Sequence, residues 1–401
     1  MKGIGALLLA VCLLLSGCGT WMEGSYVSIT PYLSSNDDGD HDIQWISNQQ
    51  QLLEAVSHMV NRGATEDVFF VRDYSEATLA TDMLVVRYQV MKLNPIGAYA
   101  VQDIQFEMGL NGGRSTLVVT VTYSRQKFEI QRLKVMQGME DISNALAAAL
   151  SAMDTELVFY VEDYQDVDFV QMVETFASEN PNEVIEVPRV SVSLYPDSGA
   201  QRVVELSFAY QTSRDSLRVM QKQVKQIFES AKLYVSGSES DYQKLSRLYV
   251  FLTGGVDVDR MLSQNSGSSI TPSYSLLRYG IGDSRAFADV YAAMCRQVGV
   301  ECLTVSGTCN GEAWFWNIVK DGDQYAHVDL LRCAQAGYFR ERSDEQMEGY
   351  VWDYLAYPAC EWKNQTPTET TEEPTQPDVT EGTETATVPP ETEGTEPPTE
   401  G

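Results

Sequence analysis

An internal duplication constrains the fold of this chain more than any other feature. The segment VFFVRDY, Val68–Tyr74, returns as VFYVEDY at Val158–Tyr164, and the alternating run that ends at Tyr123 returns as one that ends at Tyr210. The two pairs are offset by 90 and 87 positions, so the similarity extends across the whole repeat. The period of the apolar residues in each copy indicates a helix, a strand, a second helix and two strands. The sequence therefore predicts two α-β-α-β-β units, at 47–135 and 136–235.

The N-terminus has the features of an export signal. It begins MKGIGALLLAVCLLLSGCGT, with an apolar run from Ile4 to Leu15 that is short for a bilayer span. The small residues Ser16 and Gly17 before Cys18 resemble a bacterial lipoprotein signal, and an ordinary signal peptide or an anchor helix is the alternative. The resemblance implies removal of 1–17, a lipid on Cys18, a flexible tether over 18–46 and an extracytoplasmic protein held at the cell membrane.

Composition limits the partners of the chain. Its 57 acidic and 28 basic residues give a net charge of −29, which argues against binding to nucleic acid. The segment 363–401 is dominated by Thr, Glu, Pro and Gly, so it cannot bury enough apolar surface to fold and is predicted to be disordered. The acidity also predicts repulsion from anionic headgroups, so the lipid rather than charge would hold the protein at the membrane.

The C-terminal third is predicted to contain two helices, a buried strand and a β-hairpin. An amphipathic helix is predicted from Asp241, and a second follows the glycine turn in GDSRAFADVYAAMC, Gly282–Cys295. The run VECLTVSG predicts a buried strand. Two further strands, joined by a turn at 320–323, are predicted in EAWFWNIVKDGDQYAHVDLL.

This order resembles the transglutaminase-like (papain-like) superfamily in its bacterial extracytoplasmic branch. The family carries a cysteine where the second helix starts, a histidine in an H-A-W-N strand and an aspartate in HVD. Here Ser284 and Trp314 occupy the first two positions, and only Asp329 is retained. The ending from Ser343 to Cys360 is similar to the family's SD..M…Y.WD…YP.C. The resemblance implies an α+β fold with a transglutaminase-like domain at 236–362 and a degenerate catalytic triad.

These replacements disfavour hydrolysis. A serine hydroxyl needs a positioned base, and an indole has one N–H donor and no acceptor. Glu312 and His327, on the strand faces of Trp314 and Asp329 respectively, are the alternative bases. The simpler interpretation is that Ser284, with Asp283, caps the helix. We also expect the N–H of Trp314 to donate to Asp329.

Seven cysteines are present, and five remain after Cys12 and Cys18 are set aside: Cys295, Cys302, Cys309, Cys333 and Cys360. Their spacing fits no metal motif, so no metal or cofactor is expected, and their pairing cannot be deduced. Cys295 and Cys302 are expected to be buried. Cys309, in a Thr-Cys-Asn-Gly loop, is expected to be exposed near the cleft.

The sequence thus predicts a lipid-anchored pseudoenzyme that binds or scaffolds a peptide, peptidoglycan or protein partner. The alternative is a cell-envelope peptidase or amidase of the same fold with a non-standard nucleophile. A third possibility is a spacer that presents the C-terminal domain away from the membrane.

Overall fold

The structure is a computed structural model of the chain, and it describes residues 45–256 and 269–361. All of these residues fall in one compact unit, which ends at Trp362. The expected signal segment, Cys18, most of the tether and the acidic tail lie outside the described residues. Across the described residues, no helix has both the length and the apolar character needed to cross a bilayer.

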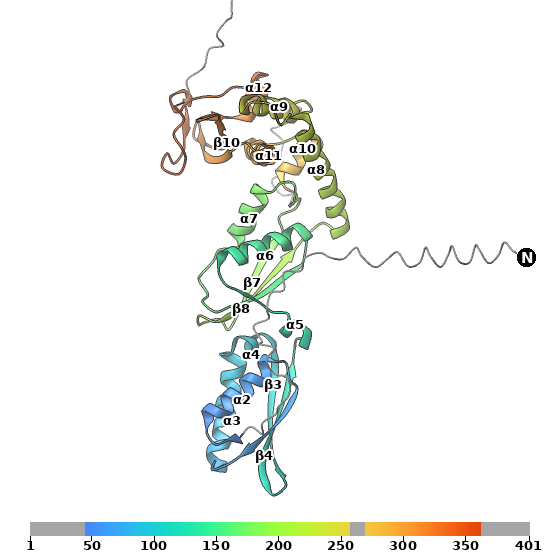
Figure 1. The fold of residues 1–401 in the computed structure, drawn as a ribbon, viewed down its shortest axis with the longest axis vertical. Coiled ribbons are helices and arrows are strands. Elements are labelled where there is room, and N and C mark those ends of the chain that lie inside the picture. Colours follow the sequence, from blue (N-terminus) through green and yellow to red (C-terminus); the bar gives the residue numbers. More distant parts are fainter. Residues whose placement is uncertain (1–44, 257–268, 362–401) are drawn as a thin grey trace, which may run out of the picture. The chain divides into compact units, whose positions relative to one another are not determined.

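The duplicated region forms two four-stranded sheets of identical topology (Figure 1). The first unit consists of β1 (Trp45–Ile46), α2 (Gln49–Asn61), β2 (Glu66–Val71), α3 (Glu76–Lys92), α4 (Pro95–Ala100), β3 (Val101–Asn111), β4 (Arg114–Tyr123) and α5 (Lys127–Gln131). The second consists of β5 (Lys134–Met136), α6 (Met139–Ala152), β6 (Glu156–Val161), α7 (Phe169–Glu179), β7 (Arg189–Tyr195) and β8 (Arg202–Ala209).

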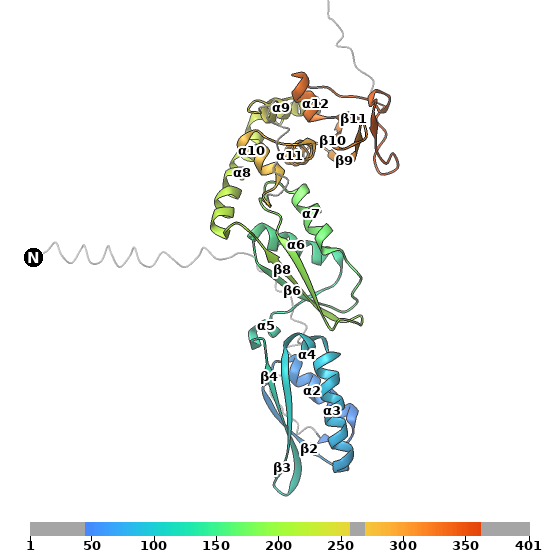
Figure 2. The same cartoon turned by 180° about the vertical axis from the view of Figure 1, so that it is seen from behind.

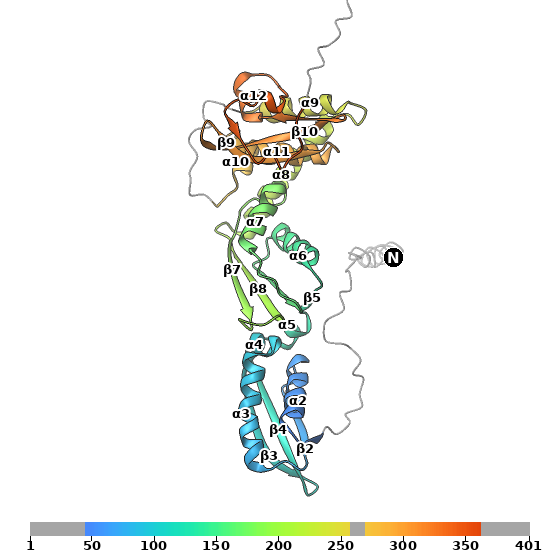
Figure 3. The same cartoon turned by 90° about the vertical axis from the view of Figure 1, so that its left-hand side faces the viewer.

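The strand orders, β1-β2-β4-β3 and β5-β6-β8-β7, place equivalent segments in equivalent positions. Helices α2 and α3 cover one face of the first sheet (Figure 2), and α6 and α7 pack against the second (Figure 3). The correspondence extends to single hydrogen bonds. Val121 N–H donates to Thr65 O at 2.8 Å, and Phe208 N–H donates to Thr155 O at 2.9 Å.

Each unit contains one strand more than the α-β-α-β-β pattern predicts. The short strands β1 and β5 pair in parallel with β2 and β6 at the start of each unit. Trp45 and Ile46, which the sequence places in the tether, form β1. Two or three residues are too few to show the alternation by which a strand is recognised.

The C-terminal region packs one helix against a third sheet. Its elements are α8 (Arg214–Tyr234), α9 (Asp241–Thr253), α10 (Pro272–Tyr279), α11 (Ser284–Gln297), β9 (Cys302–Cys309), β10 (Glu312–Asp321), β11 (Gln324–Val328), α12 (Leu330–Ala336), the 3-10 turn η2 (Asp344–Gln346) and β12 (Tyr350–Val351). The sheet has the antiparallel order β11-β10-β9-β12, and α11 packs on β9 and β10. The predicted helices at Asp241 and Ser284 are both present, and the mixed α+β class is confirmed.

The core continues from the second unit into this region. Ile185, before β7, and Leu217 and Phe228 of α8 belong to the same buried cluster as Ala286 and Val290 of α11. Backbone bonds reinforce this junction: Val187 N–H donates to Ser269 O, and Thr271 N–H donates to Ile185 O. Helix α11 is therefore buried between the third sheet and the second unit.

Candidate functional site

Helix α11 begins with a side-chain cap, and the capping residue is Asp283. Its carboxylate accepts a hydrogen bond from Ala286 N–H at 2.8 Å, which satisfies one of the free donors of the first turn. Ser284 is the first helical residue, so the expectation that it shares the capping role is wrong. Asp283 has the extended backbone of a cap, whereas Ser284 has already entered the helix.

The hydroxyl of Ser284 has a different partner. This side chain is buried, and its Oγ accepts a hydrogen bond from Phe315 N–H of β10 at 3.2 Å. Strand β11 pairs with β10 only from Asn317 onward, so it offers the Phe315 N–H no partner. Ser284 supplies the acceptor for this partly buried backbone donor. The residue at the family's nucleophile position therefore fastens the start of the helix to the strand.

Trp314 and Asp329 meet as the sequence predicts. The indole Nε1–H donates to Asp329 Oδ2 at 2.7 Å. The hydroxyl of Tyr350 donates to the same oxygen at 2.6 Å, and Arg332 N–H donates to Oδ1 at 3.0 Å. The HVD pattern suggests that Asp329 lies in the strand, but the structure places it after the strand. It is the N-cap of α12, one residue after β11 ends.

Two of the groups around Asp329 were not predicted. The guanidinium of Arg332 lies over the Trp314 ring at 5.0 Å, a cation–π contact that covers one face of the indole. Tyr350 lies in the closing Y.WD motif, and burial together with the charge of Asp329 raises its pKa. The motif was visible in the sequence, but nothing in it indicated that its tyrosine hydroxyl reaches the aspartate.

Among the described residues, Ser284 has no hydrogen bond to a basic side chain. Within the described residues, no hydrogen bond joins Ser284 to Trp314 or Asp329. The carboxylate of Asp329 is already occupied by three donors, and an indole cannot accept a proton from a hydroxyl. Trp314 and Asp329 are thus hydrogen-bonded to each other, whereas Ser284 is hydrogen-bonded to the backbone of Phe315.

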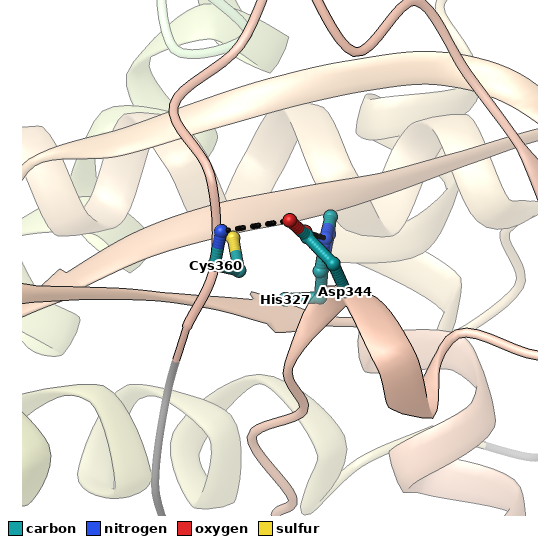
Figure 4. Close-up of side chains that lie close together, drawn as sticks. All are labelled: His327, Asp344 and Cys360. Atoms are coloured by element: carbon teal, nitrogen blue, oxygen red, sulfur yellow. Dashed lines mark hydrogen bonds and ion pairs between the residues drawn. The ribbon is translucent and has the colours of Figure 1, made fainter.

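His327 and Glu312, the alternative bases, are not near Ser284 in any hydrogen bond that the structure describes. His327 is fully buried: its Nδ1 accepts from Trp316 Nε1–H at 2.9 Å, and its Nε2 lies 2.8 Å from Asp344 Oδ1 (Figure 4). Burial lowers the pKa of His327, which favours the neutral ring. Glu312 is exposed at the start of β10. Neither residue is hydrogen-bonded to Ser284 in the described part of the chain.

One cluster has the residue types of a metal site. Ligand atoms of His327, Asp344 and Cys360 lie within 4.8 Å of one another (Figure 4). The hydrogen bonds do not suit a metal, because Nδ1 of the neutral ring is an acceptor for Trp316, so Nε2 carries the proton that it donates to Asp344. Metal-bound histidines instead donate through their second nitrogen. Asp344 also accepts from Cys360 N–H at 3.2 Å, so the cluster fixes the closing segment to the sheet.

All five cysteines of the described region are free thiols. Cys309 ends β9 and is buried, so the expectation of an exposed loop thiol is wrong. The strand runs longer than predicted, and its last side chain turns inward beneath Tyr350 and Arg332. Cys295 is buried as expected, whereas Cys302 is only partly covered. Burial raises the pKa of Cys333 to about 11 and that of Cys360 to about 12, which keeps these two thiols protonated and unreactive.

Comparison with known proteins agrees with the sequence resemblance. Residues 229–357 match the transglutaminase-like superfamily. No curated protein is significantly similar to the chain.

Solved structures with similarity are distant in sequence. A structure titled as a TGase is 9% identical to this chain, with a TM-score of 0.23. The match covers 49% of this chain and 58% of that structure. A proposed cysteine protease from Cytophaga hutchinsonii is 11% identical over 49% of this chain and 73% of its own, with a TM-score of 0.23. A proposed protease from Parabacteroides distasonis ATCC 8503 is 8% identical over 57% of this chain and 39% of its own, with a TM-score of 0.21. The chain thus spans less than two thirds of the first of these structures.

The family match begins inside α8 and includes α11 and the whole third sheet. The C-terminal region of this chain is a transglutaminase-like domain.

Proposed function

We propose that this protein is a lipid-anchored, extracytoplasmic pseudoenzyme whose transglutaminase-like domain binds or scaffolds a peptide, peptidoglycan or protein partner. The observation that carries the proposal is the hydrogen bond from Trp314 Nε1–H to Asp329. It fills the histidine position with a group that cannot accept a proton, and it uses the carboxylate that would orient a base. Ser284 instead accepts from Phe315 N–H, and no described residue forms a hydrogen bond that would activate its hydroxyl.

The catalytic part of this proposal is tested by assaying amide hydrolysis on peptides and on cell-wall digests. The wild-type protein is expected to give no turnover above the buffer rate, and Ser284→Ala is the matched control. Turnover in the wild type that is abolished in Ser284→Ala would establish the alternative, a serine peptidase or amidase of this fold.

The double substitution Ser284→Cys with Trp314→His asks whether the lost triad can be restored. Asp329 remains in place to orient a histidine, so we expect the double variant to hydrolyse peptide amides where each single variant does not. Alkylation of the new thiol should abolish that activity. An inactive but folded double variant would indicate that the surrounding groups, Arg332 and Tyr350 among them, also block the cleft.

The anchoring part of the proposal rests on Ser16-Gly17-Cys18 at the end of the apolar run. In a bacterial host we expect the wild type to sediment with membranes and to incorporate a fatty-acid label. Cys18→Ala should lose both properties, whereas Cys12→Ala should keep them. Incorporation of the label by Cys18→Ala would contradict the lipid assignment.

A further inference from the structure

Helix α3 of the first repeat unit carries apolar residues on the side that faces solvent. Leu84 is 68% exposed, Tyr88 is 62% exposed and Val85 is 37% exposed. Ala77 and Ala80 are also exposed and extend the row toward the start of the helix. Positions 77, 80, 84 and 88 are three or four residues apart, so they lie along one face of the helix. These five residues form the outer stripe of α3.

The opposite side of α3 packs on the core of the first unit. Leu79, Val86 and Val90 are buried there. Contacts with α2, α4 and β3 hold this inner side, and α3 lies at the margin of the first unit in Figures 2 and 3. A surface helix normally has one apolar side, which faces the core. Helix α3 has a second apolar side, which calls for a second neighbour.

The corresponding helix of the second unit has such a neighbour. Helix α7 contacts α11 of the C-terminal domain. The guanidinium of Arg296, in α11, also donates to Glu179 O at the end of α7, at 3.0 Å. The second unit therefore packs this helix against another helix. In the first unit the exposure of Leu84 and Tyr88 shows that the described chain leaves the outer stripe uncovered.

The outer stripe is complementary in shape to a second copy of itself. In an antiparallel pair of α3 helices with a twofold axis at Leu84, Ala80 lies level with Tyr88 of the second copy, because each is four residues from the axis. Seven residues from the axis, Ala77 lies level with Met91, which is half-buried. Small side chains thus lie level with large ones, which allows two helices to interdigitate.

The charges of α3 favour the same arrangement. Its two acidic residues are Glu76 and Asp82. Its two basic residues are Arg87 and Lys92, so the helix is neutral in a chain whose net charge is −29, and two copies of it do not repel each other through their own charges. Glu76 lies in the first turn and Lys92 in the last. An antiparallel pair brings these opposite charges to the same level, whereas a parallel pair would bring like charges together.

We propose that two copies of this protein associate through the outer stripes of α3, as an antiparallel helix pair with Leu84 at the twofold axis. The 17 residues of α3 span about 26 Å, so the pair covers less than the roughly 800 Å² per partner of a standard interface. The dimer is therefore weak, with a dissociation constant on the order of 10–100 μM. The inference does not depend on the absence of catalysis, because α3 lies outside the transglutaminase-like domain at 229–357.

Sedimentation velocity of the full chain, in detergent, tests the association. We expect the wild type to change from monomer to dimer between about 1 and 300 μM. Leu84→Glu should raise the dissociation constant about tenfold or more, because it places two carboxylates together at the axis. Leu93→Glu is the matched control, since Leu93 is 54% exposed but follows the end of α3 and lies outside the outer stripe. A wild type that stays monomeric, or a Leu84→Glu protein that dimerises as well as the wild type, would overturn the proposal.

Cysteine cross-linking tests the orientation of the two helices. Leu84→Cys places a thiol of each copy at the axis, so oxidation by diamide should join the copies through a disulfide, with both thiol protons and two electrons passing to diamide. In Leu93→Cys the two thiols would lie about 27 Å apart along the pair, so this variant and the wild type should stay uncross-linked. Cross-linking of Leu93→Cys as readily as Leu84→Cys, or of neither variant, would refute the antiparallel pair, whatever the hydrolysis assays give.

Discussion

Asp329 occupies the family's aspartate position but has structural hydrogen-bond partners in this chain. In an active member its carboxylate would orient a histidine. In this chain it receives Trp314, Tyr350 and the backbone of Arg332, and so it ties β10, β12 and α12 together. Asp329 is buried, and a replacement without carboxylate oxygens would leave these hydrogen-bond donors unsatisfied, which favours an aspartate at this position whatever the activity of the domain.

Removal of one donor should measure this structural role. Tyr350→Phe deletes only the hydroxyl that donates to Asp329, so we expect the free energy of unfolding to fall by about 1.5–3 kcal/mol, the range for a hydrogen bond to a charged group. Urea titration provides the measurement. Tyr354→Phe is the control, because Tyr354 is exposed and its loss of a hydroxyl should change stability by less than about 0.5 kcal/mol. Equal losses in the two variants would contradict the role given to Asp329.

The buried carboxyl group of Glu341 predicts how the stability of the fold depends on pH. It is buried, neither of its oxygens has a hydrogen-bond partner within the described residues, and burial raises its pKa from 4.5 to about 8. Between these values the unfolded chain ionises this group while the folded chain holds its proton. Stability is therefore expected to fall as pH rises through this window, with a slope that approaches about 1.4 kcal/mol per pH unit.

The contribution of Glu341 is isolated by comparing unfolding at pH 6, 7 and 8. Glu341→Gln cannot ionise, so the wild type should lose stability relative to this variant across the range. Glu348→Gln, a change at an exposed neighbour, should retain the wild-type slope. If the wild type and Glu341→Gln show parallel pH profiles, Glu341 ionises normally in the folded protein.

At the scale of the element, the sequence predicts those helices and strands whose pattern of apolar residues is local. The helix that begins at Asp241 buries Leu245, Leu248, Tyr249 and Leu252, the apolar positions that its periodicity marks. The short strands β1 and β5 have no such signal, because their identity depends on pairing with β2 and β6. The sequence also predicted that Trp314 would donate to Asp329, because the family resemblance places the two positions side by side. It missed Tyr350, whose contact depends on how the closing segment returns to the sheet.

The junction between α11 and β10 should depend on one hydroxyl. Ser284→Ala leaves the partly buried Phe315 N–H without its acceptor, and loss of such a hydrogen bond costs about 0.5–1.5 kcal/mol. We expect a matching loss in the free energy of unfolding and faster hydrogen exchange at the Phe315 amide. Ser306→Ala, on the exposed side of β9, is the control and should alter neither quantity. Unchanged exchange at Phe315 in Ser284→Ala would contradict this structural role.

At the scale of the whole molecule, buried groups connect the repeat units to each other as well as to the C-terminal domain. Tyr160 and Val203 of the second unit belong to the buried cluster of the first. Arg125, which follows β4, donates to Glu205 of β8 at 2.6 Å and lies 4.9 Å over the Tyr99 ring. Together with the core shared between α8 and α11, these contacts predict that residues 45–361 unfold as one cooperative unit.

Arg125 is the residue at which this cooperativity can be broken. Glu205 is mostly buried, and in Arg125→Met it would lose the cation that pairs with it while keeping the hydrogen bond from Tyr195. Loss of one partner of such a pair costs more than loss of an exposed pair, because the remaining charge stays desolvated.

Scanning calorimetry of the wild type should show a single transition, whereas Arg125→Met should show the first unit unfolding at a lower temperature. Arg72→Met is the control. Arg72 forms an exposed pair with Asp73 and a cation–π contact with Trp45 of its own unit, so its loss should leave one transition. Two transitions in the wild type would mean that the shared core does not couple the units.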